Sequence, residues 1–303
     1  MAEAGSGLAA SDPDGVRSRV LACWDAFVGT AVGLDLRRPS RIPGWSAHDV
    51  CVHLGRWDDA EPLGRLLASA RAGGTGQSPD VDADKAEVLA AHREASREEV
   101  LAALRRSREG VAAFFDSPDA NRLALAPVMT VLGTLPLLSI VHAGCYELAV
   151  HLLDLVPAGA PEPAAEVLQA GLGALLDVTA ALALRVGIAA TVGAQTPEGG
   201  WRCSIAAGGW TTVPVPPGPV PGCAILGAAA DILDVSAGRA AAPALIAARR
   251  LRVQDMRTFL TLAPLVEAVP GLPGGAPLRA AARTLGAAAA VAGRLPRLLR
   301  RPG

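Results

Sequence analysis

A run rich in proline and glycine, from Pro157 to Pro163, divides the sequence into two stretches with different hydrophobic patterns. Before this run, apolar residues recur at the three- and four-residue spacing of amphipathic helices. After it, one helical stretch is followed by short apolar runs separated by glycine pairs, which is typical of strands and hairpins. This change of period predicts two domains, which we place at residues 14–157 and 163–303.

The first stretch predicts four long helices joined by loops, the pattern of a four-helix bundle. Asp12 followed by Pro13 is a typical helix start, and Ser46 with Asp49 has the spacing of a capping box. Residues 1–12 are expected to be disordered. The expected helices cover residues 14–36, 46–57, 82–115 and 135–156.

The second stretch predicts a small sheet covered by helices, so the fold class is α followed by α+β. The expected helices cover residues 164–185 and 227–236, and the expected strands cover residues 188–193, 201–206, 211–215 and 223–226. Two glycine pairs, at 199–200 and 208–209, are expected to form hairpin turns. The arginine-rich tail, residues 277–303, is expected to be an amphipathic helix.

Composition excludes several function classes. A net charge of -1 and an aromatic content of 3% argue against nucleic-acid binding. The longest apolar run, residues 123–141, contains Pro127 and Pro136, which favours a buried core helix over a membrane span. The start has no apolar region typical of a signal peptide, and the five cysteines form no CxxC motif. We therefore expect reduced thiols and a cytoplasmic protein. The sequence leaves the oligomeric state open.

Histidine and glutamate at helical spacing predict a metal site. Glu147 and His151 are four residues apart, so a helix places them on one face. His53 lies on the inner face of the second expected helix, and the three side chains converge if these helices are neighbours. A His–Glu–His set with an open position is typical of catalytic zinc. The alternatives are a local hydrogen-bonded pair for Glu147 and His151, and a core histidine for His53.

Two motifs carry a family resemblance. The stretch from Arg41 to Leu54, RIPGWSAHDVCVHL, and the stretch from Glu147 to Leu155, ELAVHLLDL, resemble the zinc-binding bundle of mycothiol-dependent maleylpyruvate isomerases, within the DinB-like superfamily. A third stretch, GAAADILDVSAGR, resembles a helix of that family's small sterol-carrier-like C-terminal domain. The resemblance implies a DinB-like four-helix bundle followed by a sterol-carrier-like α+β domain.

The resemblance also implies chemistry. His53, Glu147 and His151 would hold zinc, or another divalent transition metal, since these ligand types also accept nickel, cobalt or iron. Mycothiol would supply a thiolate that isomerises or conjugates an unsaturated carbonyl substrate. Arg239 would hold a substrate carboxylate, or it would cap a helix end near the negative end of the dipole. Asp154 would orient a histidine ligand or cap a helix.

Two non-catalytic alternatives remain at this point. In the first, the α+β half binds a lipid or another small apolar molecule, and the metal site is vestigial. In the second, the basic tail at residues 277–303 binds a protein partner in a regulatory role. Loss of a reaction in His53→Ala or Glu147→Ala, as opposed to loss of stability alone, separates the enzyme from the first alternative. In the second, deletion of residues 277–303 is expected to remove the activity and to spare metal binding.

Overall fold

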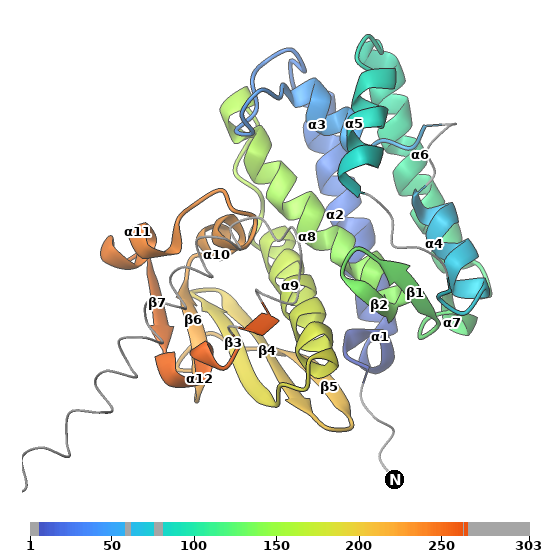
Figure 1. Ribbon diagram of the computed structural model, residues 1–303. Coiled ribbons are helices and arrows are strands. Elements are labelled where there is room, and N and C mark those ends of the chain that lie inside the picture. The colour runs from blue at the N-terminus through green and yellow to red at the C-terminus, as the bar shows by residue number, and fades with distance from the viewer. Residues whose placement is uncertain (1–5, 58–61, 76–80, 263, 266–303) are drawn as a thin grey trace, which may run out of the picture.

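Helices make up most of the first 185 residues, and a five-stranded sheet dominates the second part of the chain (Figure 1). The computed structural model describes residues 6–57, 62–75, 81–262 and 264–265. The expected helix at residues 277–303 lies outside this described part. The division into a helical part and an α+β part agrees with the predicted fold class.

Four helices pack side by side in the first part, as the sequence predicts. They are α2 (Pro13–Gly33), α3 (Ala47–Leu54), α6 (Arg97–Asp116) and α8 (Leu137–Leu155). Helix α2 packs against both α6 and α8, and α3 packs against α6. The expected caps are present: Asp12 accepts a hydrogen bond from the backbone N–H of Gly15, and Ser46 and Asp49 form a reciprocal capping box. The core between these helices includes Phe27.

The expected single helix at residues 82–115 is wrong, because this stretch holds two helices. Helix α5 (Val81–Ala91) ends before a turn, and α6 begins at Arg97. A second capping box, made by Ser96 and Glu99, starts α6. Each side chain accepts a hydrogen bond from the backbone N–H of the other residue, and these N–H groups need such partners because a new helix begins here. The expected loop region before α5 also contains α4 (Pro62–Arg71), which the sequence analysis missed.

The apolar run at residues 123–141 is expected to form a buried core helix, but most of it forms a β-hairpin that precedes α8. A short helix, α7 (Asp119–Arg122), is followed by a hairpin of β1 (Pro127–Thr130) and β2 (Gly133–Pro136). Gly133 has a φ of 86°, a left-handed conformation that a side chain disfavours. Strand β2 ends at Pro136, and helix α8 begins at the next residue.

The expected disorder of residues 1–12 is wrong for the part that the structure describes. Helix α1 (Leu8–Ser11) packs against strand β5 and helix α2. The backbone N–H of Leu8 donates to Asp177 Oδ1 at 3.0 Å, and the backbone N–H of Gly7 donates to the carbonyl of Trp210 at 3.1 Å. The apolar Leu8 side chain is buried, so the chain start is fixed to the α+β part.

The sheet has strand order β5-β4-β3-β6-β7. Its strands are β3 (Ala190–Thr196), β4 (Gly199–Ala206), β5 (Gly209–Val215), β6 (Cys223–Gly227) and β7 (Leu251–Gln254). Strands β3, β4 and β5 form an antiparallel meander, β6 pairs parallel to β3, and β7 pairs antiparallel to β6. The sequence predicts the first four strands but not β7. Both hairpin turns lie one or two residues before the expected glycine pairs.

Helix α9 (Ala165–Arg185) joins the two parts of the molecule, because it packs on α8 on one side and on β4 and β5 on the other (Figure 1). The 3-10 turn η1 (Val156–Ala158) precedes it. Short helices α10 (Ala229–Ser236), α11 (Ala242–Ala247) and α12 (Met256–Leu260) complete the described fold.

Two described helical stretches, Leu137–Ala158 and Ala165–Arg185, pass a length and hydropathy test for membrane spans. About two thirds or more of each is buried inside the protein, at 67% and 72%. Their apolar surfaces contact each other, helix α2 and the sheet. They are core helices of this fold, in agreement with the expectation of no membrane span.

Candidate metal centre

His53, Glu147 and His151 meet between α3 and α8. His53 lies near the end of α3, and the other two lie one helical turn apart on α8. One ligand atom from each lies within 4.8 Å of those of the other two, and among the described residues this is the cluster suited to a metal ion. Glu147 Oε2 is 3.5 Å from His151 Nε2. The imidazole rings of His53 and His151 meet edge to face, with centroids 5.3 Å apart. The structure thus brings together the three predicted ligands.

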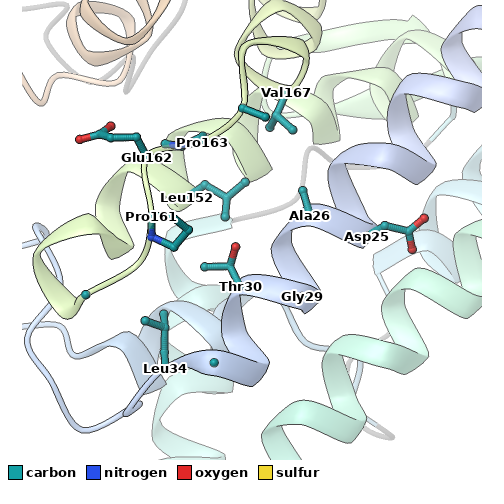
Figure 2. A pocket seen from close by; sticks show the side chains of 13 residues that line it. Asp25, Ala26, Gly29, Thr30, Leu34, Leu152, Pro161, Glu162, Pro163 and Val167 are labelled. Carbon is teal, nitrogen blue, oxygen red and sulfur yellow. The ribbon is translucent and has the colours of Figure 1, made fainter.

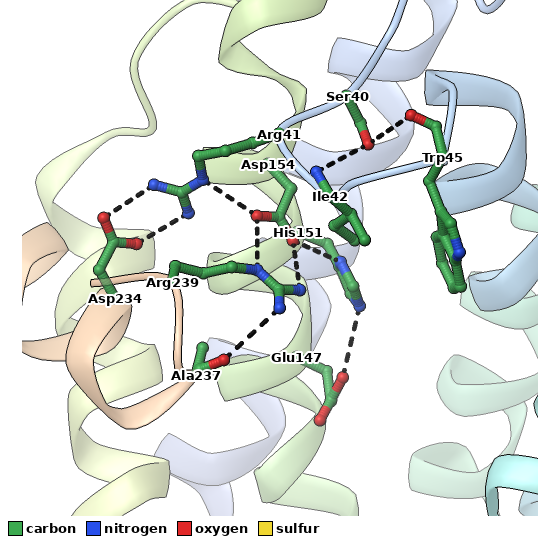
Figure 3. A network of polar contacts seen from close by, with 10 residues as sticks. All are labelled: Ser40, Arg41, Ile42, Trp45, Glu147, His151, Asp154, Asp234, Ala237 and Arg239. Atoms are coloured by element: carbon green, nitrogen blue, oxygen red, sulfur yellow. Dashed lines mark hydrogen bonds and ion pairs between the residues drawn. The ribbon is translucent and has the colours of Figure 1, made fainter. Parts of the chain in front are cut away.

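Asp154 fixes the orientation of His151 (Figure 3). His151 Nδ1 lies 3.0 Å from Asp154 Oδ2, so Nε2 is the ring nitrogen that faces Glu147. The Asp154 side chain is fully buried. A carboxylate behind a histidine is the usual outer partner of a metal-binding imidazole, and it selects the tautomer with a free Nε2. The contact favours the orienting role for Asp154 over a helix cap.

Two arginines complete the surroundings of Asp154. Arg239 donates from Nε to Oδ1 and from Nη2 to Oδ2, both at 3.0 Å, and Arg41 Nε donates to Oδ1 at 3.1 Å. Arg41 also makes a bidentate pair with Asp234, at 2.7 and 2.8 Å. Burial raises the pKa of Asp154, but the hydrogen bonds from His151 and Arg239 outweigh it and hold this pKa at about 2. Asp154 is therefore a carboxylate at neutral pH.

Burial and neighbouring charges shift the pKa values of the two cluster histidines in opposite directions. Burial, followed by the positive charge of His151, lowers the pKa of His53 to about 3, so His53 presents a neutral imidazole. Burial also works to lower the pKa of His151, but the hydrogen bonds to Asp154 and Glu147 give a net rise. Two imidazoles and a carboxylate form a donor set that fits zinc or a similar divalent ion. The Glu147 side chain is 54% exposed, so the cluster is open to solvent on that side.

Arg239 follows α10 and reaches the site only through Asp154. Its backbone N–H donates to the carbonyl of Asp234 at 2.7 Å, which ends the helix, and Nη1 lies 3.5 Å from the carbonyl of Ala237. Of the two expected roles, the helix cap has a structural counterpart, whereas the guanidinium binds Asp154 behind His151. Its contact with a substrate carboxylate stays a prediction.

Sequence reasoning missed the long-range partners of this site. It gave Arg41 no role beyond the motif, and it did not anticipate the ion pair with Asp234. The Trp45 ring meets the His53 ring edge on, with centroids 5.7 Å apart, a contact that the sequence analysis does not anticipate. His142 is fully buried and is not a member of the cluster. The position of Arg41 and Trp45 inside the RIPGW stretch was the available signal.

A groove of the described surface lies away from the three cluster residues. A groove of about 470 Å³ runs between α2 and the segment before α9, and its lining includes Thr30, Leu152 and Val167 (Figure 2). It contains none of the three cluster residues. Its two carboxylates are Asp25, which pairs with Arg108, and Glu162. The groove therefore does not extend the candidate metal centre.

Residues 18–156 match the family described as the mycothiol maleylpyruvate isomerase N-terminal domain. This part of the chain is similar to that domain, and the match covers a little under half of the sequence. The match includes His53, Glu147 and His151, whereas Arg239 lies beyond it. Among curated proteins, no sequence matches the chain.

Two solved structures are similar to this fold over most of the chain. One is a mycothiol-dependent maleylpyruvate isomerase, with 16% identity and a TM-score of 0.53. The alignment covers 80% of this chain and 92% of that one. The other is a histidine-to-alanine mutant of such an isomerase, with the same identity and coverage and a TM-score of 0.51. At this identity the likeness shows a common fold, in which a helical part is followed by an α+β part.

Proposed function

We propose that this chain is a metal-dependent enzyme that uses mycothiol, or a similar low-molecular-weight thiol, on an electrophilic unsaturated carbonyl compound. We propose His53, Glu147 and His151 as the metal ligands, zinc as the metal and the cytoplasm as the location. We also propose residues 14–157 and 163–303 as the two domains. The observation that carries the proposal is the convergence of these side chains within 4.8 Å, with Asp154 holding His151 in the tautomer that a metal needs.

The metal would stabilise the thiolate form of the thiol by supplying positive charge. The thiolate sulfur forms a bond to one carbon of a cis double bond conjugated to a carbonyl, and the electron pair moves to the carbonyl oxygen. The former double bond is now single and rotates. When the electron pair returns, the carbon–sulfur bond breaks, the thiolate leaves, and the trans isomer forms. In an S-transferase, the enolate carbon instead takes a proton, and sulfur stays on the product.

The thiol must come from outside the chain. All five cysteines are buried and free of disulfides. Burial raises the pKa of Cys51 and of Cys203 to about 12, so both are thiols at neutral pH. A buried, protonated cysteine is a poor nucleophile. The described structure therefore supports a cosubstrate thiol better than a protein cysteine as the attacking group.

Metal content tests this proposal. We expect about one zinc per chain in the purified protein, and loss of that zinc in His151→Ala. His48→Ala is a matched control, because His48 lies on the same helix as His53 but hydrogen-bonds the carbonyl of Ala95 instead. This control is expected to keep its zinc. A folded wild type without metal after incubation with zinc, or equal zinc in all three proteins, contradicts the proposal.

A further inference from the structure

Lys85 is connected to the candidate metal centre through the ring of Trp45. It belongs to α5 and is the only lysine of the chain. Its ammonium nitrogen lies 6.0 Å from the centroid of the Trp45 ring, at the outer range of a cation–π contact. Trp45 in turn meets His53 edge on. The positive charge of Lys85 also acts on the cluster, where it adds to burial and to the charge of His151 in lowering the pKa of His53.

The two arginines near the cluster are already paired. Arg239 directs two nitrogens to Asp154, and Arg41 is divided between Asp154 and Asp234. A substrate carboxylate could bind either guanidinium only by displacing the aspartate carboxylate that is already hydrogen-bonded to that arginine. Lys85, by contrast, has no ion-pair partner among the residues that the structure describes. Unlike Arg41 and Arg239, it therefore does not have to leave a carboxylate of the described structure in order to bind an anion.

Charge balance points in the same direction. Glu147, Asp154 and Asp234 with Arg41 and Arg239 leave one net negative charge when both histidines are neutral. A divalent cation at the cluster changes this to one net positive charge, and Lys85 makes it two. A ligand with two negative charges would be attracted to such a site, and an uncharged analogue would not.

We propose that Lys85 is a positioning residue that holds a carboxylate of an anionic unsaturated substrate at the open side of the metal centre. The proposal rests on the proposed function, because it takes the His53–Glu147–His151 cluster as the reaction site. It assigns recognition of substrate charge to α5, in the first part of the chain, in addition to any contribution from Arg239.

The single lysine makes a direct binding test possible. Reductive methylation with ¹³C-formaldehyde keeps the positive charge and labels Lys85 and the chain's α-amine. The Lys85 signal is the one that is missing in Lys85→Arg. In the zinc-loaded protein, maleate, a cis dicarboxylate, is expected to shift this signal in a saturable manner while the α-amine signal stays in place. Dimethyl maleate, which has the same skeleton without charge, is expected to leave the Lys85 signal unchanged.

Variants measure how much the charge contributes. Lys85→Gln is expected to weaken maleate binding to the zinc-loaded protein about tenfold, measured by calorimetry at low ionic strength. Lys85→Arg is expected to recover most of the loss. Arg105→Gln is the matched control, because it removes one positive charge from an exposed position of α6. Zinc content and thermal unfolding are expected to be the same in all of these proteins.

Failure of this inference differs from failure of the proposed function. If maleate binds Lys85→Gln as tightly as wild type while both carry one zinc, or if maleate leaves the Lys85 signal unmoved, Lys85 does not hold the substrate and the metal centre still stands. If wild type binds no zinc, the proposed function and this inference both fail.

Discussion

Asp154→Asn separates an orienting role of Asp154 from a purely structural one. The substitution keeps the size of the side chain but removes the negative charge that Arg41, Arg239 and His151 share. Loss of one member of a buried ionic network typically costs about 3–5 kcal/mol, because the remaining charges stay desolvated. The side chains of Arg41 and Arg239 are 29% and 25% exposed, so water compensates in part. We expect a loss of about 2–4 kcal/mol in unfolding free energy.

The same substitution is expected to weaken zinc binding about 10- to 100-fold, the usual range for loss of an outer partner of a histidine ligand. An asparagine can offer its NH₂ group to His151 Nδ1, which allows the tautomer with the proton on Nε2. Nε2 would then no longer be a free donor atom for a metal. Zinc affinity is measured by competition with a chromophoric chelator, and stability by urea unfolding of the metal-free protein.

Asp234→Asn is the matched control, because Asp234 pairs with Arg41 but does not contact His151. Arg41 keeps its bond to Asp154 in this variant, so a smaller loss of about 1–2 kcal/mol is expected. Zinc affinity should match wild type within a factor of about two. If Asp154→Asn and Asp234→Asn bind zinc equally well, Asp154 only joins the two parts of the molecule, and the orienting role is refuted.

Two further predictions test the interior. Iodoacetamide at pH 8 is expected to label none of the five cysteines in the native protein, because all five are buried. For Cys51 and Cys203, burial also raises the pKa to about 12, four units above the assay pH. Rapid native labelling, followed by mass spectrometry, would contradict this. Gly171→Ala is expected to destabilise the fold by about 1–3 kcal/mol, since its Cβ would lie 2.8 Å from the Cβ of Ala149. Gly144→Ala, with open space at its Cβ, is expected to stabilise α8 by up to about 1 kcal/mol, and equal urea midpoints for the two variants would refute this packing argument.

Local signals explain what the sequence predicted. The capping box at Ser46 and Asp49 and the four-residue spacing of Glu147 and His151 depend only on nearby residues, and both are present. The break between α5 and α6 was also local, because Ser96 and Glu99 have the capping-box spacing. It was missed because the helical periodicity of the whole stretch outweighed this signal. The start at residues 6–11 was missed for another reason, since its order depends on Asp177, far along the chain.

Long-range partners explain what the sequence could not predict. Arg41 and Asp234 are 193 positions apart, and Arg239 and Asp154 are 85 apart. No periodicity or motif spacing encodes which arginine reaches which carboxylate. The sequence could therefore indicate that Arg239 lies near the site, but not that its donors are already occupied by Asp154. Lys85 was missed because its placement over Trp45 depends on the turn between α5 and α6 and on the packing of α5 on α3.

These contacts imply a division of roles between the two parts of the chain. The α+β part reaches the cluster through Arg239 and Asp234, which are directed at Asp154 and Arg41 rather than at Glu147 or His53. Its effect on the reaction would therefore pass through the orientation of His151. The bundle supplies the three candidate ligands and Lys85, which carry the metal and the substrate charge in our proposal. Arg239→Ala should then resemble Asp154→Asn in zinc affinity, whereas Lys85→Gln should affect the anion alone.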